Sequence, residues 1–209
     1  HQGETLNVAI GQGAVLTTPL QLATMTARLV NGRKAVKPVL VRSIEDKGNQ
    51  NPKWESLEFN PRHLKVVCDG MNAVVNGDRG TAAASKIREE GYSMAGKTGT
   101  AQVQRITAAQ RAAGIKNEDL PWRQRHHALF VGYAPADKPR YVASVVVEHG
   151  VGGSKAAAPI ARDILLATLK RDPRTIRTVD VATEKIDTLP DTSLDVKAGE
   201  AAETSDKKE

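Results

Sequence analysis

The chain has 209 residues, of which 40% are apolar and 3% aromatic, so its length and composition fit one domain with an aliphatic core, with or without a tail. Its single cysteine, Cys68, excludes an intrachain disulfide, and no apolar run approaches the ~20 residues that span a bilayer. The formal charge of +6 is unevenly distributed: residues 1–171 hold 24 basic and 14 acidic residues, whereas residues 172–209 hold 6 basic and 10 acidic residues. The basic body is compatible with an anionic partner or with an ordinary soluble surface.

A Gly-Gln-Gly sequence at residues 11–13 closes the first segment, in which residues 5–10 alternate loosely between apolar and polar. Such a sequence can cradle a phosphate, but no lysine follows it and no strand–loop–helix unit surrounds it. We therefore interpret residues 11–13 as a structural turn.

The next segment carries the signals of a helix start. Thr18 can cap the helix, Pro19 occupies the first helical position, and Gln21 completes a capping box. Apolar residues follow at helical spacing as far as residue 30, and Gly32 can end the helix in the left-handed conformation. After it, residues 35–45 read as a strand, with Pro38 favouring a sheet edge, and residues 46–54 read as a loop.

A second helix is predicted between an Asn60-Pro61 start and Gly77. Its apolar stripe includes Cys68, which favours a place in the core over a reactive thiol. The stripe consists of Leu64, Val67, Cys68, Met71, Val74 and Val75.

Three strands in sequence predict an antiparallel meander over residues 93–104, 127–134 and 140–148. A charged connector, residues 105–125, joins the first two, and a glycine-rich turn at 150–154 follows the third. The last helix is predicted over residues 156–170, with an apolar face formed by Ile160, Ile164, Leu165 and Leu169. Residues 172–209 show no apolar period and read as a disordered acidic tail.

The first strand of the predicted meander contains Lys97-Thr98-Gly99-Thr100. A bare Lys-[Ser/Thr]-Gly triplet arises by chance in about one chain in ten of this length, so its setting matters more than the string. Here it lies on a strand of small residues that is followed by two more strands and a long helix, and Lys-Thr-Gly is one of the signatures of serine β-lactamases and penicillin-binding proteins. A strand edge without a side chain at Gly99 allows a substrate backbone to approach closely.

Several further stretches resemble the class B penicillin-binding proteins of the elongation type, and the resemblance covers residues 1–171. These stretches are residues 3–5 (Gly-Glu-Thr), 9–13 (Ala-Ile-Gly-Gln-Gly), 18–21 (Thr-Pro-Leu-Gln), 95–103 (Ala-Gly-Lys-Thr-Gly-Thr-Ala-Gln-Val), 130–135 (Phe-Val-Gly-Tyr-Ala-Pro), 145–148 (Val-Val-Val-Glu) and 156–161 (Ala-Ala-Ala-Pro-Ile-Ala).

The resemblance implies an α+β fold with an antiparallel sheet flanked by helices, residues 1–171 being the C-terminal part of a transpeptidase domain. It implies acyl transfer to a serine from a D-alanyl-D-alanine terminus, so that peptidoglycan stem peptides are cross-linked and β-lactams acylate the serine. In that chemistry Lys97 tunes the proton network and Thr98 and Thr100 bind the substrate carboxylate. Gly99 keeps the strand edge open, and the Thr100 backbone N–H serves the oxyanion hole.

The other two family signatures, Ser-x-x-Lys and Ser-x-Asn, precede Lys-Thr-Gly in such proteins and are expected before His1. The string at residues 205–208 (Ser-Asp-Lys-Lys) and the serine at residue 193 lie in the acidic tail, where no helix pattern supports a nucleophile. We therefore predict that this chain alone is inactive, and that it folds poorly alone because one face of its sheet lacks cover.

We predict no cofactor and no metal site, since adjacent His126 and His127 point to opposite faces of a strand and His63 and Cys68 face differently on a helix. The predicted partners are stem peptides, β-lactams, the upstream part of the same protein and elongation machinery that includes a glycosyltransferase, at the periplasmic face of the inner membrane. The connector has one Trp and no interleaved aromatic residues, so nucleic acid is not predicted. The alternatives are a penicillin-recognising sensor or serine β-lactamase relative, and a non-enzymatic module that binds a polyanion.

Overall fold

The structure is a computed structural model that describes residues 2–41, 43–44, 47–48, 53–104 and 107–174. Its principal strands form one antiparallel sheet in the order β3-β4-β5, and the chain divides at the junction between Asp172 and Pro173. This confirms the predicted α+β class. The principal elements are α1 (Gln2–Ala9), α2 (Pro19–Val30), α3 (Pro61–Asn76), β3 (Ala95–Ala101), α4 (Ala108–Ala112), β4 (His127–Ala134), β5 (Tyr141–Val147) and α5 (Ala157–Lys170).

The two capped helices begin where their sequences predict. The Thr18 hydroxyl accepts the Gln21 N–H at 3.2 Å, and the Gln21 Oε1 accepts the Thr18 N–H at 2.8 Å, which completes the capping box of α2. At the start of α3, the Asn60 side chain accepts the Arg62 N–H at 2.9 Å, and Pro61 takes the first helical position. These local bonds set where α2 and α3 begin. Both helices pack against the sheet that is described below.

The strand predicted over residues 35–45 is wrong for most of its length. Residues 33–35 bond instead to the backbone of residues 55–57, and Leu40 is fully exposed, so no core face draws this segment into a sheet. Among the described residues of this segment, the short β1 (Ser43–Ile44) is the only named strand. It pairs antiparallel with β2 (Lys47–Gly48), which lies in the stretch predicted as a loop.

The connector after β3 has more structure than its charge pattern predicts. Thr107 caps the short helix α4 through a capping box with Gln110, and two 3-10 turns follow. The Asn117 side chain accepts the His126 N–H at 3.0 Å and donates to the Val151 carbonyl at 3.1 Å. The connector is therefore joined both to the start of β4 and to the glycine-rich turn. Residues 105–106 lie outside the described residues.

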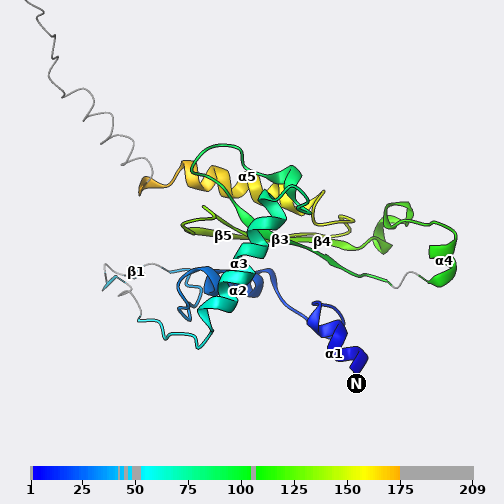
Figure 1. Cartoon of the computed structure of the whole chain (residues 1–209), viewed down its shortest axis with the longest axis horizontal. Coiled ribbons are helices and arrows are strands. Elements are labelled where there is room, and N and C mark those ends of the chain that lie inside the picture. Colours follow the sequence, from blue (N-terminus) through cyan, green and yellow to red (C-terminus); the bar gives the residue numbers. More distant parts are fainter. Residues whose placement is uncertain (1, 42, 45–46, 49–52, 105–106, 175–209) are drawn as a thin grey trace, which may run out of the picture. The chain divides into compact units, whose positions relative to one another are not determined.

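The sheet confirms the predicted meander, with Thr98 of β3 opposite Phe130 of β4 and Phe130 opposite Val145 of β5. Figure 1 shows α5 on one side of these strands and α2 on the other, while α3 crosses beside β3. The Val75 end of α3 is buried in the cluster that contains α5, and Met71 packs with Tyr133 on the side of α2. Since successive strand residues point to opposite faces, Phe130 faces α5 while Leu129 and Val131 face the side of α2.

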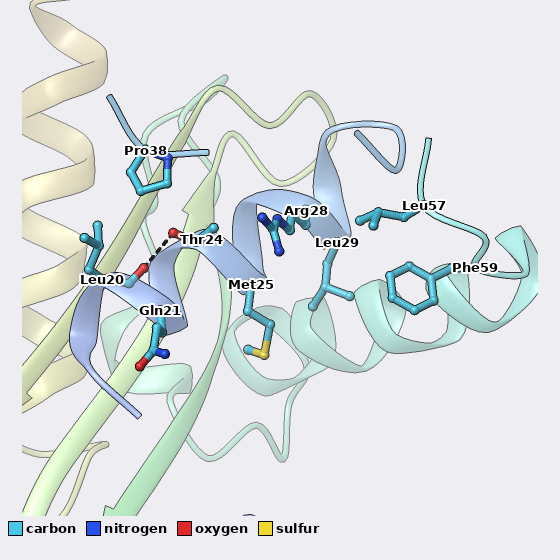
Figure 2. Close-up of a pocket in the computed structure, with 9 residues that line it drawn as sticks. All are labelled: Leu20, Gln21, Thr24, Met25, Arg28, Leu29, Pro38, Leu57 and Phe59. Atoms are coloured by element: carbon cyan, nitrogen blue, oxygen red, sulfur yellow. Dashed lines mark hydrogen bonds between the residues drawn. The ribbon is translucent and has the colours of Figure 1, made fainter. Parts of the chain in front are cut away.

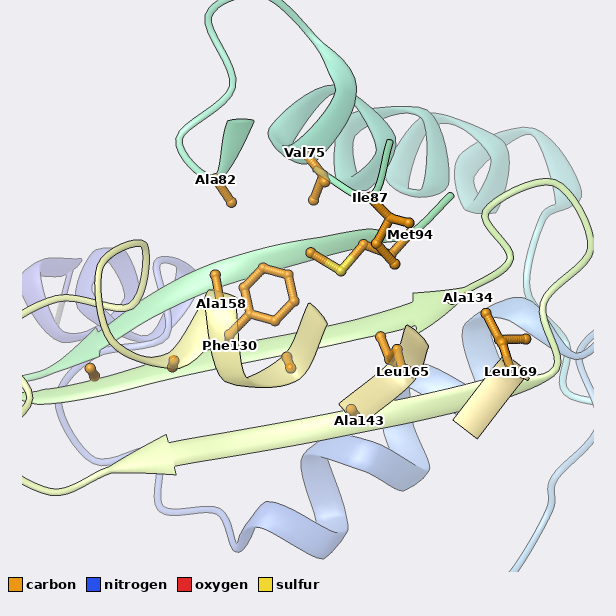
Figure 3. Close-up of a cluster of buried hydrophobic side chains, with 13 residues drawn as sticks. Val75, Ala82, Ile87, Met94, Phe130, Ala134, Ala143, Ala158, Leu165 and Leu169 are labelled. Carbon is orange, nitrogen blue, oxygen red and sulfur yellow. The ribbon is translucent and has the colours of Figure 1, made fainter. Parts of the chain in front are cut away.

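The core between α5 and the sheet is aliphatic apart from Phe130 (Figure 3). The predicted apolar face of α5 is wrong in part: the observed buried face is rotated by part of a turn, and Ile160 and Ile164 are 44% and 49% exposed. Small side chains lie against the sheet instead, and they allow the helix to approach it closely. The buried face consists of Ala157, Ala158, Ala161, Leu165 and Leu169.

Asp172, which composition assigns to the acidic tail, is buried against β5. Its carboxylate accepts the Tyr141 hydroxyl at 2.7 Å and forms an ion pair with Arg140. These contacts attach the second residue after α5 to the start of β5. Residues 175–209, the remainder of the predicted tail, lie outside the described residues.

Candidate active site

The strand β3 has one open edge, because among the described residues it pairs with β4 alone. The Thr98 carbonyl accepts the Lys97 ammonium at 2.7 Å, and the Thr100 carbonyl accepts the Gln12 side-chain amide at 3.0 Å. A strand residue whose carbonyl points away from the paired strand also directs its N–H away. The backbone N–H groups of Thr98 and Thr100 therefore face the open edge.

A cavity runs along this edge, and all four residues of the Lys-Thr-Gly-Thr sequence line it. Lys97 and Thr100 are exposed, whereas Thr98 and Gly99 are half-buried. Alternation along the strand places Lys97 and Gly99 on the face of α2 and the two threonines on the face of α5. The cavity thus combines one ammonium, two hydroxyls and backbone donors at an edge that an extended peptide can join.

The opposite wall of the cavity is the turn after α1. Gly11 and Gly13 have φ angles of 75° and 74°, which favour glycine, and between them Gln12 directs its amide to the Thr100 carbonyl. The turn is structural, as interpreted, and it also lines the site. Sequence reasoning missed the Gln12 contact, although a polar residue between two glycines was a signal for it.

Two glycines meet at the middle of β3. A Cβ at Gly153 would lie 2.7 Å from the Gly99 carbonyl oxygen and 3.0 Å from the Gly99 nitrogen, and closer still to the Leu129 carbonyl. On the other face, a Cβ at Gly99 would lie 3.3 Å from the Leu129 Cβ. The 150–154 segment, predicted as a glycine-rich turn, therefore packs directly against the Lys-Thr-Gly strand.

The hydroxyl of Thr98 has a neighbour outside the cavity. Thr81, in the segment after α3, places its Oγ1 3.2 Å from the Thr98 Oγ1. The sequence contains no motif that marks Thr81, because the contact joins residues 17 positions apart through the packing of α3 on β3.

Beside the site, an apolar groove lies between α2 and α3 over the sheet. Lys97 and Val131 line both this groove and the cavity of the open edge. Val67 of the predicted stripe is 44% exposed and its neighbour Val66 is 70% exposed, so part of this face of α3 lacks cover in the described chain. The groove is also lined by Met25, Thr26, Leu29, Gly70, Met71 and Val74.

Cys68 of α3 interacts with Tyr133 of β4. Tyr133 is buried, and burial first, then its contact with the half-buried Cys68, raises the pKa of the Tyr133 hydroxyl above its ordinary value. The tyrosine is therefore neutral in the folded protein, and Cys68 packs at the edge of the core.

A further apolar cavity involves α2 and the segment that contains Leu57 and Phe59 (Figure 2). Its polar lining groups make local bonds: Thr24 donates to the Leu20 carbonyl at 2.8 Å, and Arg28 donates to the Val36 carbonyl at 3.0 Å. This cavity offers mostly apolar surface, and no residue of the Lys-Thr-Gly-Thr sequence lines it, so it is not the candidate active site.

The histidines make bonds to the backbone. His126 Nδ1 accepts the Val103 N–H at 3.3 Å, and His127 Nδ1 accepts the His149 N–H at 2.9 Å. Within the described ranges, no group of three or more His, Cys, Asp or Glu side chains is placed to hold a metal ion. No helix in these ranges has the length and apolar character needed to cross a membrane.

Comparison with known proteins places these features in a family. The penicillin binding protein transpeptidase domain matches residues 1–166. The peptidoglycan D,D-transpeptidase MrdA of Haemophilus influenzae is 37% identical over 172 residues, which cover 78% of this chain and 25% of the relative. MrdA of Acinetobacter baumannii is 38% identical over 179 residues, which cover 82% of this chain and 26% of the relative.

Solved structures agree with the sequence relatives. Pseudomonas aeruginosa PBP2, in complex with WCK 5153, superposes with a TM-score of 0.66 at 36% identity, covering 83% of this chain and 35% of that chain. PBP2 in its complex with MreC from Helicobacter pylori superposes with a TM-score of 0.61 at 32% identity, covering 78% and 26%. The chain thus spans about a quarter of the length of the curated relatives it matches. It belongs to the penicillin-binding protein transpeptidase domain family, of the PBP2 (MrdA) type.

Proposed function

We propose that this chain forms the substrate-binding wall of a peptidoglycan D,D-transpeptidase whose serine nucleophile lies in a part of the protein outside the chain. The observation that carries the proposal is the open edge of β3, where Lys97, Thr98, Gly99 and Thr100 line one cavity. An extended stem peptide can align with this edge through the backbone groups of Thr98 and Thr100.

In the proposed reaction, the serine oxygen attacks the carbonyl between the two terminal D-alanines. An ester bond forms, the peptide bond breaks, and the last D-alanine leaves with a proton on its amine. The amine of a second stem peptide then attacks the ester, so that a new peptide bond forms and the serine hydroxyl is restored. A β-lactam enters the first step only, because its opened ring remains attached to the serine.

The residues of β3 have different proposed roles, which depend on their positions along the strand. The Thr100 N–H, directed to the open edge, donates to the oxyanion that develops on the attacked carbonyl. The hydroxyls of Thr98 and Thr100 bind the terminal carboxylate, and the Lys97 ammonium supplies positive potential and holds the proton network in place. Gly99, with Gly153 against its other face, keeps the strand thin enough for the peptide to approach.

The position of Lys97 indicates where the serine approaches. Since Lys97 lines both the cavity and the groove between α2 and α3, a segment seated in that groove would reach the Lys97 ammonium. Covering the groove removes the apolar surface of Val66 and Val67 from water, which favours the contact.

The cellular setting follows from the same proposal. Cross-linking of stem peptides takes place at the periplasmic face of the inner membrane, where an anchor in the remainder of the protein would hold this domain. A PBP2 relative has been solved in complex with MreC, and we propose that this protein likewise acts with elongation machinery, including a glycosyltransferase.

Acylation of the full-length protein by a fluorescent penicillin tests the proposal. Wild type should become labelled on a serine outside this chain, and Lys97→Ala should slow labelling by about a hundredfold or more, since it removes the charge that supports the proton network. Lys138→Ala, at an exposed lysine of the β4–β5 turn, is the matched control and should label like wild type.

Two other outcomes would replace the proposal. Rapid release of the hydrolysed penicillin would identify a β-lactamase relative. Absence of labelling, together with a gel shift of nucleic acid that weakens with salt, would identify a polyanion-binding module.

A further inference from the structure

The segment after α3, which contains Gly80, Thr81 and Ala82, is held in a fixed position by contacts with α3. The Ala82 N–H donates to the Val74 carbonyl at 2.9 Å, and Ala82 itself is buried. Gly80 lies so close to the last turn of α3 that a Cβ there would be 2.6 Å from the Ala73 carbonyl oxygen. The Asn76 side chain donates to the Met94 carbonyl at 2.9 Å, which joins the end of α3 to the start of β3.

Thr81 lies within this fixed segment, and its hydroxyl meets that of Thr98. The two Oγ1 atoms are 3.2 Å apart, and either can be the donor. Thr98 lines the cavity, whereas Thr81 does not line the cavity and contacts Thr98. A ligand in the cavity therefore contacts Thr98, whereas Thr81 acts on that ligand through its bond to Thr98.

The direction of this bond decides what Thr98 can offer to a substrate. A hydroxyl has one hydrogen and two lone pairs. If Thr98 donates to Thr81, the Thr98 hydrogen is already bonded to the protein and is not offered to a ligand. If Thr81 donates to Thr98, the Thr98 hydrogen is free for a ligand, and the accepted bond polarises the Thr98 hydroxyl and strengthens its donation.

We propose that Thr81 is a positioning residue that donates to Thr98 and thereby reserves the Thr98 hydrogen for the terminal carboxylate of the acyl donor. A carboxylate accepts only, so its arrival selects this direction of the bond. The inference rests on the proposed function, and it adds a specificity determinant outside the Lys-Thr-Gly sequence: Thr81 favours acyl donors with a free carboxylate over those without one.

The test compares two acyl donors on the full-length protein. One is a penicillin with a free carboxylate, and the other is the methyl ester of the same penicillin. Thr81→Val keeps the shape of the side chain and removes the hydroxyl. It should slow acylation by the free acid about threefold to tenfold, the range expected for one hydrogen bond, and leave acylation by the ester unchanged. With a peptide donor, KM should rise more than kcat falls.

Two further variants separate positioning from structure. Thr81→Ser keeps a hydroxyl and should therefore retain the wild-type preference for the free acid, which Thr81→Val loses. Thr168→Val removes a hydroxyl that bonds to the Ile164 carbonyl within α5 and should change neither rate.

Equal slowing of both donors by Thr81→Val, or no slowing of either, would overturn the inference while wild-type acylation still supported the proposed function. A wild-type protein that neither donor acylates would overturn both.

Discussion

At the scale of single residues, the site depends on close backbone contacts that side chains would prevent. Gly99 has Gly153 against one face and the Leu129 side chain near the other, so β3 is held between the glycine-rich turn and β4. The Thr100 N–H is the next donor along the strand. Its position relative to a bound carbonyl therefore depends on how Gly99 is held.

Gly153→Ala is expected to slow penicillin acylation of the full-length protein by about tenfold or more, because the added methyl must displace the Gly99 backbone and small displacements at a reacting centre are costly. Gly152→Ala is the matched control, since a Cβ at Gly152 has no atom within 4 Å. Equal acylation rates for the two variants would contradict this account of Gly153.

The raised pKa of Tyr133 predicts that the protein loses stability at alkaline pH. Burial raises its pKa above the ordinary value of 10.0, so the tyrosine is neutral in both folded and unfolded states below that pH, and its contribution is fully present there. As pH rises above this value, the unfolded state releases the proton first and the folded state loses stability. Tyr133→Phe should flatten the fall in unfolding free energy from about pH 9 to about pH 11, measured by urea unfolding. The same slope in both proteins would show that Tyr133 does not cause the fall.

At the scale of elements, the sequence predicted those that local capping bonds or continuous apolar runs define. Thr18 and Asn60 identify their helices through caps, and β4 and β5 stand out as runs of apolar residues on either side of a proline-rich turn. Elements that depend on distant contacts were missed. Residues 35–41 have strand composition, yet their neighbours bond to residues 55–57 and leave Leu40 in solvent.

The same distinction applies to the site. The Lys-Thr-Gly-Thr sequence and its place on a strand could be read directly, but Gln12 and Thr81 reach β3 from segments far away in the chain. The buried face of α5 was misjudged because alanines give a weak apolar signal, whereas Ile160 and Ile164 give a strong one and face outward.

The capping box of α2 gives a prediction at this scale. Thr18→Ala removes the hydroxyl that accepts the Gln21 N–H and should cost about 1 kcal/mol of local stability. Hydrogen exchange at the amides of the first turn of α2 should become about fivefold faster. Thr17→Ala, one residue earlier and outside the capping bonds, should leave exchange unchanged, and equal exchange in both variants would contradict the role of the cap.

At the scale of the whole molecule, the described chain leaves its groove and both sheet edges open. Among the described residues, β3 and β5 each pair only with β4. Exposed apolar surface of this kind favours contact with further protein, and unpaired strand edges favour pairing.

The chain in isolation is therefore expected to bind a hydrophobic dye and to unfold without a sharp cooperative transition, whereas the full-length protein should bind little dye. Dye fluorescence and calorimetry on both proteins provide the measurement. A sharp, reversible transition of the isolated chain would show that residues 1–172 are stable without further cover.

The alanines on the inner face of α5 set how closely that helix lies to the sheet, and the helix begins directly after the turn that carries Gly153. A larger residue at Ala157, Ala158 or Ala161 would lift the start of α5 and draw Gly153 away from Gly99. On the proposed function, mutation in a helix that contributes no side chain to the cavity is therefore expected to reduce acylation by β-lactams, and genetic selection with such drugs should recover these positions.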